Sequence, residues 1–165
     1  MTLVEAAAHA ESLAEAGDEK GLATLRQQWD DELEAAARDG DYRIRAQAYR
    51  AIAQFRYRQK MELLRRGLED ESPAARGSAL IALESLSRAH PGDVNAQRSL
   101  LHEMVTHDPN MAVRRLAIVC LKNGSSTRDT VMILTGLAED DEQDGELRKT
   151  AKAVAAVLKK RADTK

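Results

Sequence analysis

The residues best able to bind a metal ion are two histidines in the segment 102–107. His102-Glu103 begins a pattern close to the HExxH motif, in which two histidines one helical turn apart bind zinc. Here the second histidine is His107, one position later than that motif requires. Five residues turn a helix by roughly 500°, which separates the two imidazoles by about 140°. The sequence therefore predicts no metal site and no cofactor.

Other reactive residue types fit structural roles better than catalytic ones. Asn123-Gly124-Ser125 is the nearest approach to a phosphate-binding loop, but the second glycine and the lysine of such loops are missing. Cys120 occupies a small-residue position of the repeat described below, where a packed thiol is expected. Runs of acidic residues fall at expected helix ends, where solvated charge is usual; they lie at 30–31, 69–71 and 139–142. We therefore expect no catalytic residues and no enzyme activity.

Aromatic and basic residues gather in one part of the chain. The aromatic residues all lie between Trp29 and Tyr57, and residues 41–66 carry eight bases but only two acids. Tyrosine and arginine are enriched where proteins bind partners, whereas Trp29 and Phe55 fit core positions. The candidate partner-binding residues are Tyr42, Tyr49, Arg50, Tyr57, Arg58, Arg65 and Arg66.

Three interpretations of this basic stretch remain open. It could bind an acidic protein partner or a nucleic acid, since both accept arginines interleaved with aromatics. It could also pair with residues 1–40, which carry ten acids and three bases.

One residue pattern recurs four times and indicates repeated helices. An acidic residue is followed six positions later by arginine, then by alanine three positions after that, and then by a small or apolar pair. Residues with these spacings of three and four lie on one face of a helix. A second, leucine-rich segment follows the early copies, so each repeat is predicted to be a helix pair that needs neighbours to bury its apolar face. The acid–arginine pairs are Asp39 and Arg45, Asp70 and Arg76, Asp108 and Arg114, and Glu142 and Arg148.

The third copy, Asp108 to Leu121 with Val113-Arg114 and Ala117 inside it, resembles HEAT and HEAT-like repeats. The resemblance covers roughly residues 39–158. It implies an all-α fold, a right-handed α-solenoid of stacked antiparallel helix pairs. It also implies that the four acids and four arginines form a structural ladder of hydrogen bonds between adjacent repeats. The signatures of tetratricopeptide and ankyrin repeats are missing.

Capping and turn residues place the expected helices. Ser72 and Asp108 each precede a proline, as N-cap residues often do, and Gly40 and Gly124 fall where helices should end. Gly67 and Gly136 occupy matching places in two second helices, which suggests close packing or early helix termination. The expected helices span 3–16, 19–38, 41–55, 57–69, 73–89, 94–107, 110–122, 127–139 and 145–161.

We expect one domain over residues 1–165. It would comprise a divergent capping pair (1–38), three repeats (39–141) and a C-terminal capping helix (142–165).

Composition excludes several classes of protein. The 165 residues carry a net charge of −2, which lacks the overall basic character typical of nucleic-acid binding. The single Cys120 fits a reducing compartment. The N-terminal segment has no basic region of a secretory signal, and no apolar stretch approaches the length of a membrane span. We therefore expect a cytoplasmic protein with no membrane partner.

The leading hypothesis for function is a non-enzymatic scaffold or adaptor that binds a protein partner through its solenoid surface. The alternative is a nucleic-acid-binding protein, because some HEAT-like proteins resemble alkylpurine DNA glycosylases. A third hypothesis, a lyase-like or chaperone-like role, follows only from the short HEAT-like repeats of some phycobilin lyases, and a shared fold does not fix function.

Substituting one arginine tests the implied ladder. We expect Arg114→Ala to lower the free energy of unfolding by a few kcal/mol, because it would leave a buried acidic partner uncompensated. Thermal denaturation of wild type and variant measures the effect. A melting temperature unchanged within error would contradict the ladder.

Overall fold

The computed structural model describes residues 1–163, and over this range the chain is all-helical. This confirms the predicted all-α class, while the right-handed sense of the stacking stays a prediction. The chain divides into two compact units between Leu86 and Ser87, and each unit is described by itself. No helix in the described range combines the length and the apolar character that crossing a membrane requires.

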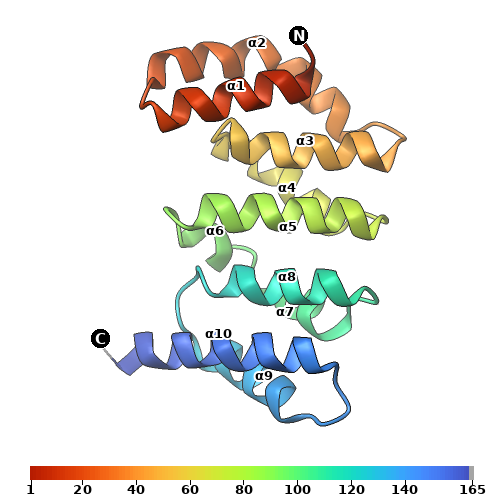
Figure 1. The fold of residues 1–165 in the computed structure, drawn as a ribbon, viewed down its shortest axis with the longest axis vertical. Helices are drawn as coiled ribbons and strands as arrows, with labels where there is room; N and C mark the ends of the chain where they lie inside the picture. Colours follow the sequence, from red (N-terminus) through yellow and green to blue (C-terminus); the bar gives the residue numbers. More distant parts are fainter. Residues whose placement is uncertain (164–165) are drawn as a thin grey trace. The chain divides into compact units, whose positions relative to one another are not determined.

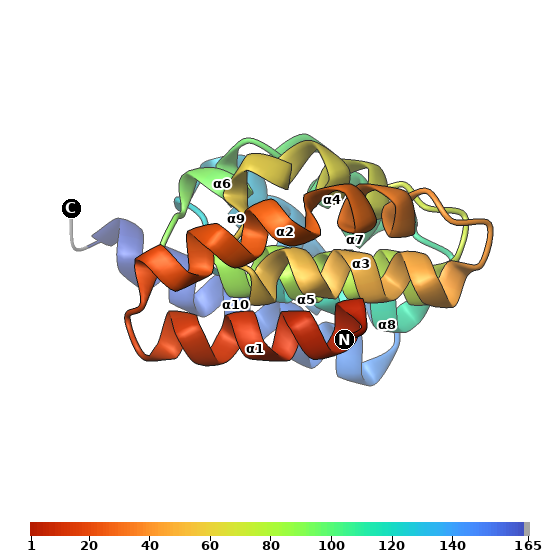
Figure 2. The ribbon, with the colours of Figure 1, turned by 90° about the horizontal axis from the view of Figure 1, so that it is seen from above.

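In the first unit, α1 and α2 form an antiparallel pair, and α3 packs against both (Figure 1). Viewed from above, α1 and α2 lie on opposite sides of α3 (Figure 2). Behind α3, a short 3-10 turn η1 leads into α4. The elements are α1 (Leu3–Glu15), α2 (Glu19–Ala37), α3 (Tyr42–Gln54), η1 (Arg58–Lys60), α4 (Met61–Leu68) and α5 (Pro73–Ser87).

Local sequence explains where these helices begin and which face they bury. Thr2 and Glu5 form a capping box on α1, while Asp18 and Asp41 cap α2 and α3 through their side chains. Alanines in the interior let neighbouring helices approach closely, and leucines fill the remaining space. The buried residues of this unit include Ala6, Ala10, Leu22, Leu33, Ala48, Ile52, Phe55, Leu64, Leu68 and Leu83.

The second unit pairs α7 with α8 and α9 with α10, and α10 also contacts α8. Cys120 on α8 is fully buried, as its small-residue position predicted. The core around it includes Leu101, Val105, Ala117, Ile118, Leu134, Leu147, Ala151 and Leu158. The elements are α6 (Gly92–Asn95), α7 (Arg98–His107), α8 (Met111–Leu121), α9 (Arg128–Glu139) and α10 (Gly145–Asp163).

The expected helices match these elements except at two places. The segment expected as one helix over 57–69 begins with η1 before α4. The single helix expected over 94–107 is wrong, because Gln97 (φ −105°, ψ 9°) leaves helical geometry between α6 and α7. On either side of this break, Asn95 Nδ2 donates to Ser125 Oγ (2.9 Å) and Arg98 Nη2 donates to the Ser125 carbonyl (3.0 Å). These bonds to the loop between α8 and α9 accompany a helix break that periodicity alone did not reveal. The division into capping pair, repeats and capping helix stays a prediction.

The two glycines that the sequence matched have different surroundings. A Cβ atom on Gly67 would lie 2.8 Å from Ala79 Cβ and 3.0 Å from the ring of Tyr49, so α4 closely approaches both α3 and α5. A Cβ atom on Gly136 would have no neighbour within 4 Å, and this residue lies inside α9. Close packing therefore explains Gly67 but not Gly136.

This contrast predicts opposite effects of one substitution. Gly67→Ala should lower the free energy of unfolding by about 1–3 kcal/mol, because neither Ala79 nor the Tyr49 ring has room for a methyl group. Gly136→Ala should raise it by about 1 kcal/mol, because alanine favours the helix and meets no atom. Urea denaturation measures both variants. Shifts of the same sign in the two variants would contradict this packing.

Candidate interaction surface

The acidic residue of the repeat shapes the turn between two helices. Asp39, Asp70 and Asp108 each accept the backbone N–H of the residue two positions later, at 2.8, 2.9 and 2.9 Å. In the fourth copy the same bond, at 3.0 Å, runs from the N–H of Glu142 to Asp140. The structure thus gives the repeated role to Asp140 rather than to Glu142, which the spacing selected.

The reason for this correction is a longer turn. In the first three copies, the N-cap residue of the next helix follows the aspartate by two positions, as Asp41, Ser72 and Asn110 do. Before α10 the capping residue is Asp144, which accepts the N–H of Leu147 at 3.0 Å. Two extra residues therefore separate the aspartate from its arginine.

Arg45 joins two successive turns of the first unit. Its Nε and Nη2 donate to the two carboxylate oxygens of Asp70, at 2.8 and 2.9 Å. Its Nη1 donates to the carbonyls of Asp39 (2.9 Å) and Gly40 (3.2 Å). The side chains of Arg45 and Asp70 are only 12% and 6% exposed, so this is a buried, bidentate ion pair.

The other repeated arginines also bind carbonyl oxygens at turns or helix ends, with different further partners. Arg76 donates to the carbonyls of Asp70 (2.9 Å) and Glu71 (3.3 Å), in the same way as Arg45. Arg114 donates to the Val105 carbonyl (2.7 Å) and to the Gln143 side chain (3.3 Å), and not to the carboxylate that the implied ladder assigned to it. Arg114→Ala would therefore remove these two bonds without leaving a buried carboxylate unpaired. Arg148 donates to the Ala138 carbonyl (3.3 Å) and to the Asp141 carboxylate (3.1 Å).

Two of the three candidate tyrosines are engaged inside the first unit. Tyr49 is buried, and its hydroxyl donates to Asp70 at 3.3 Å, so its assignment to the surface is wrong. It faces inwards because Asp70, from the next repeat, supplies an acceptor for its hydroxyl. Tyr57 is half-buried, and its hydroxyl donates to Asp30 at 2.7 Å. Only Tyr42 is largely exposed, beside the guanidinium of Arg43.

Part of the basic stretch pairs with the acidic N-terminal segment. Lys60 Nζ lies 2.7 Å from carboxylate oxygens of both Asp30 and Glu34 on α2. Burial alone would lower the pKa of Lys60, but the hydrogen bonds that it donates to the two carboxylates raise it to about 12. Arg65 likewise pairs with Glu62 on its own helix, α4, and with Glu69, the residue that follows this helix. These bases stabilise the fold and offer little charge to a partner.

Of the remaining candidates, Arg58 and Arg66 are exposed on η1 and α4, and Arg50 is exposed on α3. Arg50 lines a surface pocket of about 280 Å³ formed by α1, α3 and α5, which we call the Arg50 pocket. Its floor contains buried Ala53 and Ala82 and the 44% exposed Ile81. The remaining lining residues are Glu11, Gln54, Arg56 and Ser85.

Sequence reasoning missed most of this pocket, although the repeat carried a signal for it. Arg45 and Arg76 are equivalent, 31 residues apart. The same offset relates Arg50 to Ile81 and Gln54 to Ser85, so equivalent positions of two successive repeats line the pocket.

The family model of HEAT repeats matches residues 30–103, which include α3, α4, α5 and the Arg45–Asp70 ion pair. Over residues 30–103 the chain is therefore similar to HEAT repeats. A search of curated proteins found no significant match. HEAT repeats are commonly protein-interaction scaffolds and are generally not catalytic.

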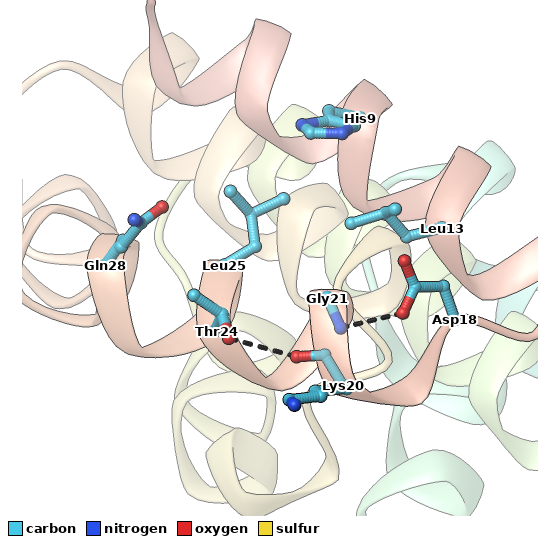
Figure 3. A pocket seen from close by; sticks show the side chains of 8 residues that line it. All are labelled: His9, Leu13, Asp18, Lys20, Gly21, Thr24, Leu25 and Gln28. Atoms are coloured by element: carbon cyan, nitrogen blue, oxygen red, sulfur yellow. Dashed lines mark hydrogen bonds between the residues drawn. The ribbon is translucent and has the colours of Figure 1, made fainter.

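A second hollow lies between α1 and α2 (Figure 3). Its polar groups bond locally: Asp18 accepts the N–H of Gly21 at 2.9 Å, and the Thr24 hydroxyl donates to the Lys20 carbonyl at 3.0 Å. Both bonds stabilise the first turns of α2. His9 faces this hollow from α1, with no second ionisable ring beside it in the close-up (Figure 3).

The histidines considered for metal binding have other surroundings. His102 Nε2 lies 2.8 Å from the hydroxyl of Thr130, and burial lowers the pKa of this imidazole. His107 is exposed at the end of α7. Within residues 1–163, no group of three or more His, Cys, Asp or Glu side chains is arranged to hold a metal ion.

The Arg45–Asp70 pair predicts a pH-dependent stability. Burial alone would raise the pKa of Asp70, but hydrogen bonds from Arg45 and from the Ser72 N–H lower it below its usual value. The stabilisation is therefore complete above the unfolded pKa of about 3.9 and is lost as the pH falls through the lower folded pKa. Asp70→Asn should lower the free energy of unfolding by about 3 kcal/mol near pH 7, since Arg45 would lose its counter-charge.

Urea denaturation of wild type and Asp70→Asn, at neutral pH and at about pH 2.5, measures this dependence. The difference between the two proteins should shrink at the lower pH. An equal difference at both pH values would contradict the role of the ionised carboxylate.

Proposed function

We propose that this protein is a non-enzymatic scaffold that binds a protein partner through the Arg50 pocket. The observation that carries the proposal is the contrast between Arg50 and the other basic residues nearby. Lys60, Arg65 and Arg45 bond to carboxylates of the chain itself, whereas Arg50 is exposed beside an apolar floor. Interaction surfaces combine apolar contacts with arginines in this way.

The family match supports the same function, because HEAT repeats commonly serve as protein-interaction scaffolds. The structural roles of the reactive side chains support it too. Asp70 and Asp140 bond to the backbone of their turns, and the Cys120 thiol lies in the core. The proposal includes a cytoplasmic location, which a single buried cysteine favours.

Protein is a better partner than nucleic acid for this surface. Binding to a nucleic-acid backbone needs a run of bases that neutralises several phosphates. Internal ion pairs with Asp30, Glu34, Glu62 and Glu69 interrupt such a run in the first unit. Arg50, Arg58 and Arg66 remain exposed, and among these three Arg50 lies at the pocket with the apolar floor, which suits a short segment of protein.

Affinity purification followed by quantitative mass spectrometry tests the proposal. The tagged chain, purified after nuclease treatment, should retain a discrete protein that also binds it when both are pure. Arg50→Glu should weaken that binding about tenfold or more, which is roughly 1.4 kcal/mol. Arg66→Glu, an exposed position on α4 outside the pocket, serves as the matched control and should bind normally. Loss of all captured protein on nuclease treatment, with salt-sensitive binding to duplex DNA, would contradict the proposal.

A further inference from the structure

The Arg50 pocket has a second guanidinium whose position is held by an unusual backbone conformation. Among the described residues, Arg56 is the one non-glycine residue with a positive φ, at 51°. It follows the end of α3, where a helix usually ends with glycine because glycine adopts this conformation without strain. A glycine in this conformation does follow α1, where Gly17 has a φ of 75°.

Several bonds keep Arg56 in this conformation. Its backbone N–H donates to the Ala53 carbonyl at 3.0 Å, and its Nη1 donates to the same carbonyl at 2.8 Å. Arg26 from α2 donates to the carbonyls of Phe55 and Arg56, both at 2.8 Å. The guanidinium is therefore positioned at the pocket before any ligand arrives. Strained residues that the surrounding structure holds in this way cluster at sites that bind ligands.

The charges around the pocket are unbalanced in favour of an anion. Neither Arg50 nor Arg56 forms an ion pair within residues 1–163. The nearest lining acid, Glu11, accepts a hydrogen bond from Gln54 Nε2 at 3.3 Å. Guanidinium groups bind carboxylates through two parallel hydrogen bonds, which gives them a preference for acidic side chains over other acceptors.

The pocket also has an apolar part. Ile81, which is 44% exposed, lines the pocket together with the two arginines and the buried Ala53 and Ala82. The pocket volume of about 280 Å³ is large enough for one apolar side chain of a longer ligand.

From these observations we infer that the Arg50 pocket binds an acidic peptide segment of a partner protein. One apolar side chain of that segment lies on Ile81, Ala53 and Ala82. Carboxylates on either side of it bind Arg50 and Arg56. This inference rests on the proposed function and names the chemistry of the partner.

Fluorescence anisotropy with synthetic peptides tests the inference on the full chain. The probe is a labelled peptide with a central leucine between two runs of glutamate. Comparison peptides replace every glutamate by glutamine, or the leucine by serine. The glutamate–leucine peptide should bind wild type with an affinity that falls as salt is added. Each comparison peptide should bind more weakly by about tenfold.

Two variants assign the binding to the pocket. Arg50→Glu should weaken it about tenfold or more. Arg56→Gly should weaken it about fivefold or more while leaving the melting temperature equal or higher, because glycine relieves the positive φ. Arg128→Glu is the matched control, because it reverses the charge of an exposed arginine in the first turn of α9. This variant should bind the peptide as wild type does.

The inference is overturned if the glutamine peptide binds as tightly as the glutamate peptide, or if Arg56→Gly binds normally. Self-association of the chain that Arg50→Glu abolishes would also overturn it, since a second copy would then occupy the pocket. A chain that still captures a partner but ignores the peptides would retain the proposed function and lose this inference. A chain that does neither would lose both.

Discussion

A helix ends with carbonyl groups that have no partner in that helix, and in this protein arginines from other segments bind many of them. Arg26 binds the carbonyls that end α3, and Arg161 binds those of Lys122 and Gly124 after α8. Arg45 binds the carbonyls of its own turn and the carboxylate of the next turn. An interior of alanine and leucine excludes water but specifies little about how neighbouring helices slide along each other. The planar guanidinium supplies that specification because its donors point in fixed directions.

The same chemistry divides the arginines into two groups. Most of those in the first unit bond to carbonyls or carboxylates of the chain, and their number says little about what the protein binds. Arg50 differs because it lies at a position where its repeat equivalent is the apolar Ile81. Arg50 and Ile81 occupy equivalent positions of two successive repeats, so this small part of the surface is both charged and apolar. Function in a repeat protein is expected at such departures from the pattern, because the common positions maintain the stacking.

The sequence predicted the helical repeats because their causes are local. Spacings of three and four, caps at Asp41 and Ser72, and alanines at contact positions are all visible in a single segment. It failed where a distant residue decides the outcome. Tyr49 was expected at the surface because no nearby residue in the sequence supplies an acceptor for its hydroxyl. The acceptor is Asp70, which comes from the next repeat. The spacing rule chose Glu142 because nothing local marks the two extra residues before α10. The sequence predicted part of the Arg50 pocket: it selected Arg50, but only the three-dimensional structure shows that Arg56 and Ile81 also line the pocket.

The placement of Trp29 and Cys120 gives each half of the molecule its own natural reporter. Trp29 is the single tryptophan and lies half-buried on α2, while Cys120 is the single cysteine and is fully buried on α8. Indole fluorescence therefore follows melting of the N-terminal half, and the rate at which the thiol reacts with a disulfide reagent follows opening of the C-terminal half. Stacked repeats often lose cooperativity as the array lengthens. Comparing the two signals in the wild-type chain shows whether the two halves unfold together, and no label has to be introduced.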